Sequence, residues 1–249
     1  MSPLCRLWLI LALMCVLPAS AVAAPVGERV EAWPNSGRIV FRVYYGNDGL
    51  RLGQTVHEWS HDAQRYQMRS LVETAGLAAL IKRFRLEQKS EGTVGAKGLK
   101  PRLFTADQRG KPFQSARFDW SAGRVFIDRG DSTREAKIEV GDQDVLSIMH
   151  QLPRLSLAGI ERKLTLINNK AASVSELKDL GVETVELPLG TLRTRHLAVK
   201  SLDGGVSLDL WLALDRHLLP VRVRMTDRKG EVLDQQAERI ELGTGQPAS

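Results

Sequence analysis

The stretch Pro220-Val-Arg-Val-Arg-Met-Thr226 decides the fold class. Apolar side chains alternate along it with charged ones: Val221, Val223 and Met225 against Arg222 and Arg224. Successive side chains of a β-strand point to opposite faces, so this alternation predicts a strand with one buried and one solvated face. Arg-Lys-Gly at 228–230 predicts a tight turn, after which a last strand over 232–240 would complete a hairpin.

The same alternation, interrupted by Gly-rich turns, occupies most of the chain before this stretch. It begins with Ile39, Phe41 and Val43 on one side of an expected strand over 38–45. Further strands are expected at 53–60, 65–74, 84–89, 101–107, 113–120, 125–128, 136–140, 163–167, 172–177, 182–187, 191–199 and 206–214. Strands joined by short turns indicate a meander of hairpins. We therefore predict a mainly β protein with a strongly curved antiparallel sheet, or open β-barrel.

Two segments break the alternation and predict short helices that cover the open side of the sheet. Residues 76–83 are expected to form a short helix or a buried crossing segment. Residues 142–152 place apolar side chains on one helical face, with Asp142 as the amino-terminal cap and Pro153 as the stop.

The amino end has the pattern of a secretory signal peptide. An apolar run over 7–17 follows Arg6, and Ala21-Val-Ala23 provides a small-x-small cleavage site. The run is shorter than the roughly 20 residues that a spanning helix needs, which disfavours the alternative of a retained anchor. We expect a signal peptide over 1–23, a flexible leader over 24–36, a single β domain over 37–241 and a loose tail over 242–249.

Composition and charge narrow the function. Of 249 residues, 43% are hydrophobic and 26% charged, as in ordinary globular proteins, and the net charge of +6 is spread along the chain, which gives no indication of a nucleic-acid partner. Both cysteines, Cys5 and Cys15, lie in the signal peptide, so disulfides, thiolate catalysis and Cys-bound zinc are excluded for the mature chain. No later apolar stretch is long enough for a transmembrane segment.

Candidate catalytic and metal sites are weak. On an extended strand His57 and His61 would stand about 13 Å apart, too far to share a metal, so solvated histidines are expected. Ser147 and His150 lack a G-x-S-x-G elbow, and no phosphate-binding loop is present. We therefore expect a noncatalytic protein with no cofactor and no metal.

Arginines on the expected outward faces are a second feature. Adjacent strands would bring Arg193, Arg195, Arg222 and Arg224 into an outer stripe. A charged, solvated face is the ordinary interpretation of such a stripe, and contact with anionic lipid or polysaccharide is the alternative.

Large side chains on the inward faces suggest a ligand site, because a wide curved sheet can leave room for an apolar molecule. The candidate ligand-binding residues are Tyr45, Trp59, Trp120, Val145, Met149, Trp211 and Met225. The alternative is that these side chains fill the protein's own core.

Several short segments together resemble a known family. They are Gly53-Gln-Thr55 leading to Trp59 and Tyr66, Gly98-Leu-Lys-Pro101, Gly141 with Gln143-Asp-Val-Leu-Ser147, and Trp211-Leu-Ala213 with Asp215 and Leu219-Pro-Val221. In order and spacing they resemble the bacterial envelope family called domain of unknown function 3108 (DUF3108), over residues 36–240. The resemblance implies a secreted, periplasmic, strand-rich domain and supplies no catalytic residues.

The hairpin from Trp211 to Val223 is more distantly similar to lipoprotein-carrier half-barrels of the LolA and LolB kind. Such a carrier holds acyl chains in a curved sheet covered by helices, so the similarity implies a lipid or lipoprotein ligand. The sequence thus leaves two hypotheses. The first is a periplasmic module that binds an apolar or amphiphilic envelope component. The second is a scaffolding envelope protein with a filled core, which meets a protein partner through its outer face or edge strands.

Overall fold

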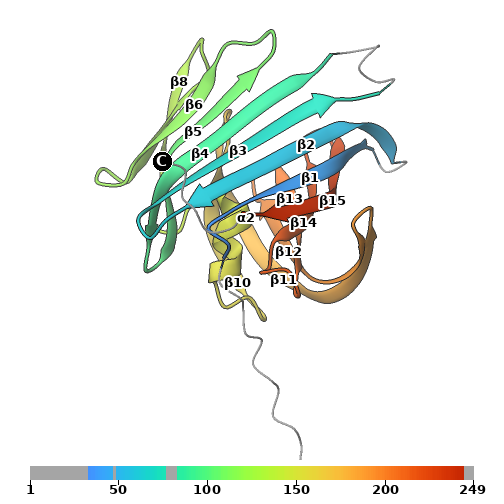
Figure 1. The fold of residues 1–249 in the computed structure, drawn as a ribbon. Helices are drawn as coiled ribbons and strands as arrows, with labels where there is room; N and C mark the ends of the chain where they lie inside the picture. Colours follow the sequence, from blue (N-terminus) through green and yellow to red (C-terminus); the bar gives the residue numbers. More distant parts are fainter. Residues whose placement is uncertain (1–32, 47–48, 77–82, 244–249) are drawn as a thin grey trace, which may run out of the picture.

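The structure, a computed structural model, describes residues 33–46, 49–76 and 83–243, which form one large sheet around a short helix (Figure 1). The expected signal peptide, most of the leader and tail, and most of the segment over 76–83 lie outside the described residues. The elements are β1 Ser36–Tyr45, β2 Leu50–His61, β3 Arg65–Thr74, β4 Arg85–Gly95, β5 Gly98–Gln108, β6 Gln114–Asp119, β7 Arg124–Asp128, β8 Thr133–Lys137, β9 Gln143–Asp144, α2 Ser147–Gln151, η1 Leu152–Arg154, β10 Glu161–Ile167, β11 Ala172–Leu187, β12 Gly190–Ser201, β13 Ser207–Ala213, β14 Pro220–Thr226 and β15 Val232–Leu242.

The sheet is an antiparallel meander that is not closed into a barrel. Its order is β8-β7-β6-β5-β4-β3-β2-β1-β15-β14-β13-β12-β11-β10-β9, so β1 and β15 join the two halves of the chain. All neighbouring pairs are antiparallel except β9 with β10. The edge strands β8 and β9 do not pair with each other. The prediction of a mainly β, curved antiparallel sheet is confirmed.

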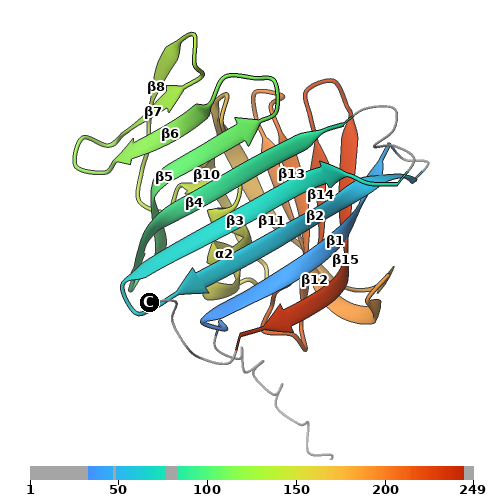
Figure 2. The ribbon, with the colours of Figure 1, turned by 45° about the horizontal axis from the view of Figure 1, so that its top comes forward.

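The sheet curves until its two halves face each other, with helix α2 between them (Figure 2). The halves also meet across the opening, where the Asn169 side chain on the turn after β10 donates a hydrogen bond to Gln114 of β6. The enclosed space is packed with apolar side chains from both halves and from the helix. The largest of them that are almost fully buried are Tyr66, Phe41, Phe104, Ile39, Ile127, Ile148, Leu152, Ile167, Leu177, Leu197, Leu210 and Leu212.

The deciding stretch forms β14 with the predicted bounds. Val221 and Val223 are 0% and 5% exposed, and Met225 is partly buried against the same core, whereas Arg222 and Arg224 lie on the opposite face. Two strand predictions are wrong. The strand expected at 136–140 is β8, which begins earlier and ends at Lys137. Residues 172–187 were expected as two strands and form the single strand β11. The pairing with β12 is irregular between Asp179 and Gly181, and this irregularity absorbs the break in alternation.

The expected helix over 142–152 is also wrong in extent. Only Ser147–Gln151 is α-helical, and Leu152–Arg154 continues it as a 3₁₀ turn. Asp142 does not cap the helix, because its carboxylate accepts hydrogen bonds from the backbone N–H groups of Thr165 (2.6 Å) and Glu139 (2.7 Å). Those bonds hold it beside β10, and the residues that follow form β9.

Candidate functional site

The interior contains a polar layer where the strands β2 to β4 face the segment Gln143–Arg154, which we call the plug. The plug consists of β9, α2 and η1. Its polar side chains meet polar side chains from the inner face of the sheet, and both sets are buried. The buried members are Thr55, His57, Ser70 and Ser90 of the sheet and Gln143, Asp144, Ser147, His150 and Gln151 of the plug.

Asp144 is the centre of this layer and is 0% exposed. Its Oδ1 accepts hydrogen bonds from the backbone N–H groups of Leu146 and Ser147, both at 2.9 Å, which fixes the start of the helix. Its Oδ2 accepts the hydroxyl hydrogen of Ser90 at 2.6 Å. Burial raises the pKa of the Asp144 carboxyl above its usual value, since no cation compensates the loss of water. Asp144 therefore ties the plug to strand β4.

Tyr66 extends the network toward β3. Its hydroxyl lies 3.1 Å from Ser90 Oγ, and because the Ser90 hydrogen points to Asp144, Tyr66 is the donor in this pair. Burial raises the pKa of the Tyr66 phenol well above its usual value, and the nearby Asp144 charge adds to this. The phenol thus stays protonated, as its role of donor requires.

Two glutamines attach the plug to the turn between β4 and β5. Gln151 Oε1 accepts a hydrogen bond from Leu99 N at 2.7 Å, and Gln143 Nε2 donates to Leu99 O at 2.9 Å. Gly98 has φ +97°, and a Cβ there would lie only 2.1 Å from Gln151 Oε1. Glycine is therefore required at this turn both by its backbone conformation and by the close approach of the plug.

His57 and His150 form the third contact between sheet and plug. Their Nε2 atoms are 2.8 Å apart, the rings stack at 5.1 Å, and each residue is 1% exposed. Burial lowers the pKa of His57 to about 4 and that of His150 well below its usual value, so both rings are neutral at pH 7 and one donates to the other. The expectation of a solvated side chain is wrong for His57, because β2 turns it inward.

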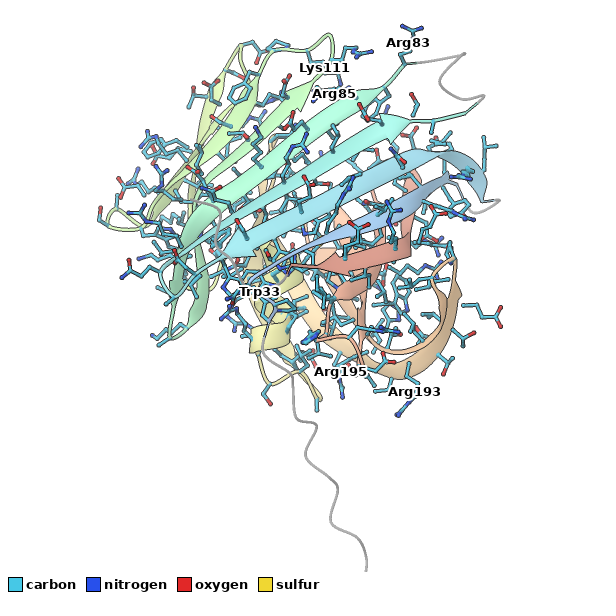
Figure 3. All side chains as sticks on the ribbon, viewed as in Figure 1. Trp33, Arg83, Arg85, Lys111, Arg193 and Arg195 are labelled. Carbon is cyan, nitrogen blue, oxygen red and sulfur yellow. The ribbon has the colours of Figure 1, made fainter. Side chains whose placement is uncertain are left out.

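Aromatic rings cover the histidine pair at the lower end of the sheet, where Figure 3 labels Trp33. The Trp33 ring stacks on His61 at 3.8 Å and lies 5.0 Å from the His150 ring. The Arg154 guanidinium lies over the Trp33 ring, 4.7 Å from its centre. The described end of the expected flexible leader is thus packed against the plug.

The geometry of this layer favours attachment over chemistry. Ser147 Oγ accepts from Asp144 N and donates to Asp144 O, and His150 is engaged by His57, so Ser147 and His150 are not a nucleophile and base. In the part of the chain that the structure describes, no three His, Cys, Asp or Glu side chains could hold a metal together. The polar groups hold two parts of the same chain against each other.

Three of the seven candidate ligand-binding residues, Trp59, Val145 and Met149, lie at the plug or on the inner face beside it, and a fourth, Met225, packs against the core from β14. Trp59 is 3% exposed, and its Nε1 donates to Pro34 O at 2.9 Å. Met149 is buried on α2, Val145 is partly buried just before it, and Met225 is partly buried against the core. Trp120 lies elsewhere, at the end of β6, where its Nε1 donates to Pro101 O.

Tyr45 and Trp211 differ in direction. Tyr45 pairs with Leu233, which pairs with Met225, so Tyr45 shares the inner face but is 40% exposed at the end of β1. Trp211 pairs across the sheet with His196 on one side and Arg222 on the other, so it lies on the face opposite to Val223. The expected inward direction of Trp211 is wrong, because the register places it on the face of Arg222, although the ring is only 6% exposed and packs within the buried apolar cluster.

The outer face around Trp211 is covered by ionic contacts and by the long hairpin of β11 and β12. His196 lies between two carboxylates, with Nδ1 3.0 Å from Glu183 and Nε2 3.0 Å from Asp209. The Trp211 indole donates to Glu183 at 2.6 Å. The hairpin then reaches β15, where Leu189 N donates to Ala237 O at 2.9 Å.

The expected outer stripe of four arginines does not form. Arg222 binds Asp234, with Nη2 2.6 Å from Oδ2, and Arg195 binds Asp179 at 2.7 Å. The register places His196 and not Arg195 in line with Arg222, so the two strands present their arginines to opposite faces. Figure 3 labels Arg193 and Arg195 at the lower end of the molecule.

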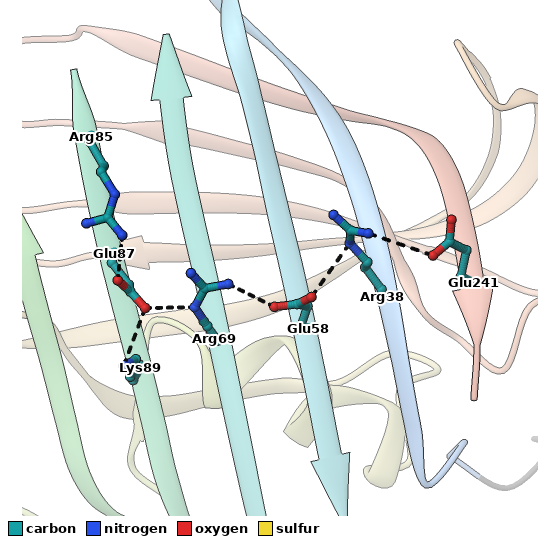
Figure 4. Close-up of polar contacts among 7 residues, drawn as sticks. All are labelled: Arg38, Glu58, Arg69, Arg85, Glu87, Lys89 and Glu241. Atoms are coloured by element: carbon teal, nitrogen blue, oxygen red, sulfur yellow. Dashed lines mark hydrogen bonds and ion pairs between the residues drawn. The ribbon is translucent and has the colours of Figure 1, made fainter. Parts of the chain in front are cut away.

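The outer face of β1 to β4 bears a ladder of opposite charges (Figure 4). Arg69 is its centre, with Nε 2.7 Å from Glu87 and Nη1 3.0 Å from Glu58. Hydrogen bonding to Arg69 is the largest cause that lowers the pKa of Glu87 to about 2. The remaining contacts join Glu58 to Arg38, Arg38 to Glu241, and Glu87 to Arg85 and Lys89. The positive and negative charges on this face therefore neutralise each other.

Two hollows along the described residues bear on a ligand site, and charged and polar side chains contribute to the lining of both. The larger, of about 370 Å³, lies over β1, β14 and β15 and includes Tyr44, Arg222 and Asp234. The other, of about 330 Å³, lies over β2 to β4 and includes Glu58, Arg69 and Glu91. The first has a mainly polar lining, and the second combines charged side chains with Trp59 and Met68.

Comparison with known proteins agrees with this fold. Residues 40–236 match the family described as "Protein of unknown function (DUF3108)". The chain belongs to this family. No curated protein matches it. Two of the segments that resemble DUF3108 in the sequence are Gly98–Pro101 and Gly141–Ser147. They contact each other through the hydrogen bond from Gln143 to Leu99, which attaches the plug to the sheet.

Two solved structures are similar to this DUF3108 chain. A β-barrel-like protein of the domain of unknown function DUF1849 from Brucella abortus has TM-score 0.55 and 11% identity, covering 86% of this chain and 100% of its own. A protein called a "putative lipoprotein" from Parabacteroides distasonis has TM-score 0.31 and 9% identity, covering 84% and 97%. The first shows the fold alone, and the second is too dissimilar to support an argument. Among the described residues, no helix has the length and apolarity to cross a membrane.

Proposed function

We propose that this DUF3108 protein is an exported, noncatalytic module of the bacterial envelope that acts through its outer surface, with an interior filled by its own chain. One observation carries the proposal: the plug occupies the concave side of the sheet. Its side chains Ile148 and Leu152 are 1% and 0% exposed. This is the place that an acyl chain would take in a lipid carrier.

The plug is also fastened, which argues against a lid that opens for a ligand. Asp144, Gln151 and His150 each bond a different strand or turn of the sheet. Opening would leave these buried polar groups without partners, and each unpaired group costs about 1–3 kcal/mol. The inward Trp59 and Met149 accordingly pack within the protein's own core.

Export rests on the sequence of residues 1–23, with its apolar run and the small residues before Ala24. The experiment is to express the full chain in a Gram-negative host, fractionate the cells and measure the intact mass. We expect a periplasmic product that begins at Ala24. An uncleaved chain in the cytoplasm would contradict the proposed export.

The filled interior is tested by mass spectrometry of lipids extracted from the natively purified protein, together with titration of a fluorescent fatty acid. We expect no stoichiometric lipid and no saturable uptake. The carrier hypothesis predicts about one lipid per protein and its loss in Met225→Arg, which places a cation beside the core. Val182→Arg is the matched control, since Val182 is 45% exposed on another strand. Lipid lost in the first variant and kept in the second would overturn the proposal.

A further inference from the structure

The turns at one end of the sheet form a continuous surface, which we call the rim. It comprises the described residues at the turns β1–β2, β3–β4, β5–β6, β7–β8, β10–β11, β12–β13 and β14–β15, at the top of Figure 2. Contacts join neighbouring turns: Arg109 N donates to Arg85 O, Gly46 N to Val232 O, and Arg228 Nε to Gly204 O. The bond between Asn169 and Gln114 joins the two halves. These hydrogen bonds link turns that are far apart in the sequence.

Large apolar side chains are exposed on the rim. Leu50, Phe113 and Leu202 are 63%, 59% and 55% exposed, and each lies at a different turn. Val174, whose carbonyl accepts a hydrogen bond from Leu202 N, is close to the same edge. The three turns lie at the same end of the sheet, with the β3–β4 and β14–β15 turns between them. Apolar side chains that project from several loop tips at one end can enter a membrane surface together.

Cations lie between these apolar side chains. Arg83, Arg109, Lys111, Lys170 and Lys229 are all exposed, and none is ion-paired among the described residues. Figure 3 labels Arg83 and Lys111 at this end. The contrast with the outer face is clear, because there Arg38, Arg69 and Arg85 each bind a glutamate.

The acidic residues of the rim are partly engaged by their own turns. Asp203 accepts hydrogen bonds from the Ser201 and Ser173 hydroxyls, and Asp227 Oδ1 accepts from Lys229 N and Glu231 N. These bonds turn carboxylate oxygens toward the protein. On the same turns Lys229 is exposed, whereas Arg228 donates hydrogen bonds to the backbone carbonyls of Gly204 and Asp203.

We propose that the rim binds the surface of an anionic membrane, with Phe113 and Leu50 entering the headgroup region and the surrounding cations binding lipid phosphates. The cations that are not ion-paired would bind the negatively charged headgroups, and the exposed apolar side chains would enter the boundary between headgroups and acyl chains. The inference rests on the proposed action through the outer surface and names the partner of that surface.

The test is co-sedimentation of the full exported protein with phosphatidylcholine vesicles, with and without phosphatidylglycerol. We expect binding only with the anionic lipid, weakening as salt is raised. The double variant Lys111→Glu, Phe113→Ser should lower the affinity by at least about tenfold. The control Lys97→Glu, Val140→Ser makes the same changes at the opposite end of the sheet, where both residues are exposed, and should change it by less than about twofold.

Three results would overturn the inference: no binding to anionic vesicles, equal binding to both kinds of vesicle, or equal loss in the two double variants. Salt-sensitive binding to a soluble sulfated polysaccharide without vesicle binding would assign the rim to polysaccharide. Failure of the proposed function would look different, because lipid taken into the interior would be lost in Met225→Arg and kept in Lys111→Glu, Phe113→Ser.

Discussion

The inner and outer faces of strands β2 to β4 carry polar networks of similar extent but opposite surroundings. On the inner face, Ser90 and Asp144 meet at 5% exposure or less. On the outer face, Arg69 and Glu58 meet with 37% and 39% of their side chains exposed. A buried polar group that loses its partner cannot recover it from water, whereas an exposed one can. The same kind of contact should therefore matter on one face and hardly at all on the other.

The largest effect is expected at the centre of the inner network. Asp144→Ala leaves the Ser90 hydroxyl and the N–H groups of Leu146 and Ser147 without an acceptor, so we expect about 3 kcal/mol loss in the free energy of unfolding. Urea denaturation followed by tryptophan fluorescence measures it. Asp144→Asn keeps one acceptor oxygen and should lose less than half as much. Equal losses in the two variants would show that the hydrogen bonds are not the cause.

A second test concerns the turn that the plug grips. Gly98→Ala combines a positive φ with a Cβ that displaces Gln151, so we expect about 2–3 kcal/mol of destabilisation. The control is Gly110→Ala at a rim turn, where φ is +76° and nothing lies within 4 Å of the added Cβ. It should lose only the backbone part, about 1 kcal/mol. A difference near zero between the two would mean that the plug yields to the new methyl group.

The pH dependence of the free energy of unfolding is a third way to distinguish the two faces, because the buried histidines lie on the inner face. His57 has a pKa of about 4 in the folded protein against 6.5 in the unfolded chain, so the unfolded chain binds more protons between these values. Stability is complete above pH 6.5 and is lost as pH falls toward 4, by about 2 kcal/mol between pH 7.5 and 5.

The raised pKa of Asp144 acts in the opposite direction, because the folded protein then binds the extra proton. The control is therefore the double variant His57→Gln, His150→Gln, which retains Asp144 and removes both buried imidazoles, because burial alone would keep the pKa of a remaining His150 lowered. Denaturation midpoints across the pH series should fall in the wild type and stay nearly level in this variant. Parallel curves would exclude the histidine pair as the origin of acid sensitivity.

The strands were predictable from alternation because inward positions are mostly apolar, as in Ile39, Phe41 and Val43. The polar layer was not, because it depends on polar residues at inward parity whose partners lie far away in the chain. His57 precedes Trp59 by two and so shares its face, which was the one local signal of burial. Its partner is His150, and no pattern within either segment indicates that these two meet.

The direction of Trp211 and the extent of the helix failed for a related reason. Trp211 lies in a strand rich in leucines, but it shares its face with Asp209. On that face Glu183, from the hairpin of β11 and β12, accepts a hydrogen bond from the Trp211 indole. The helix is short because Asp142 finds donors in Thr165 and Glu139. Long-range contacts thus overrode local propensity at both places.

The smallest effect is expected on the outer ladder. Glu58→Gln removes the carboxylate charge that bridges Arg38 and Arg69, yet all three side chains are more than one-third exposed, so the arginines regain water. We expect a change below about 0.5 kcal/mol in the free energy of unfolding. The same denaturation measurement at low and high salt checks the cause, since salt should reduce even this difference. A loss as large as that of Asp144→Ala would mean that the two faces do not differ as burial requires.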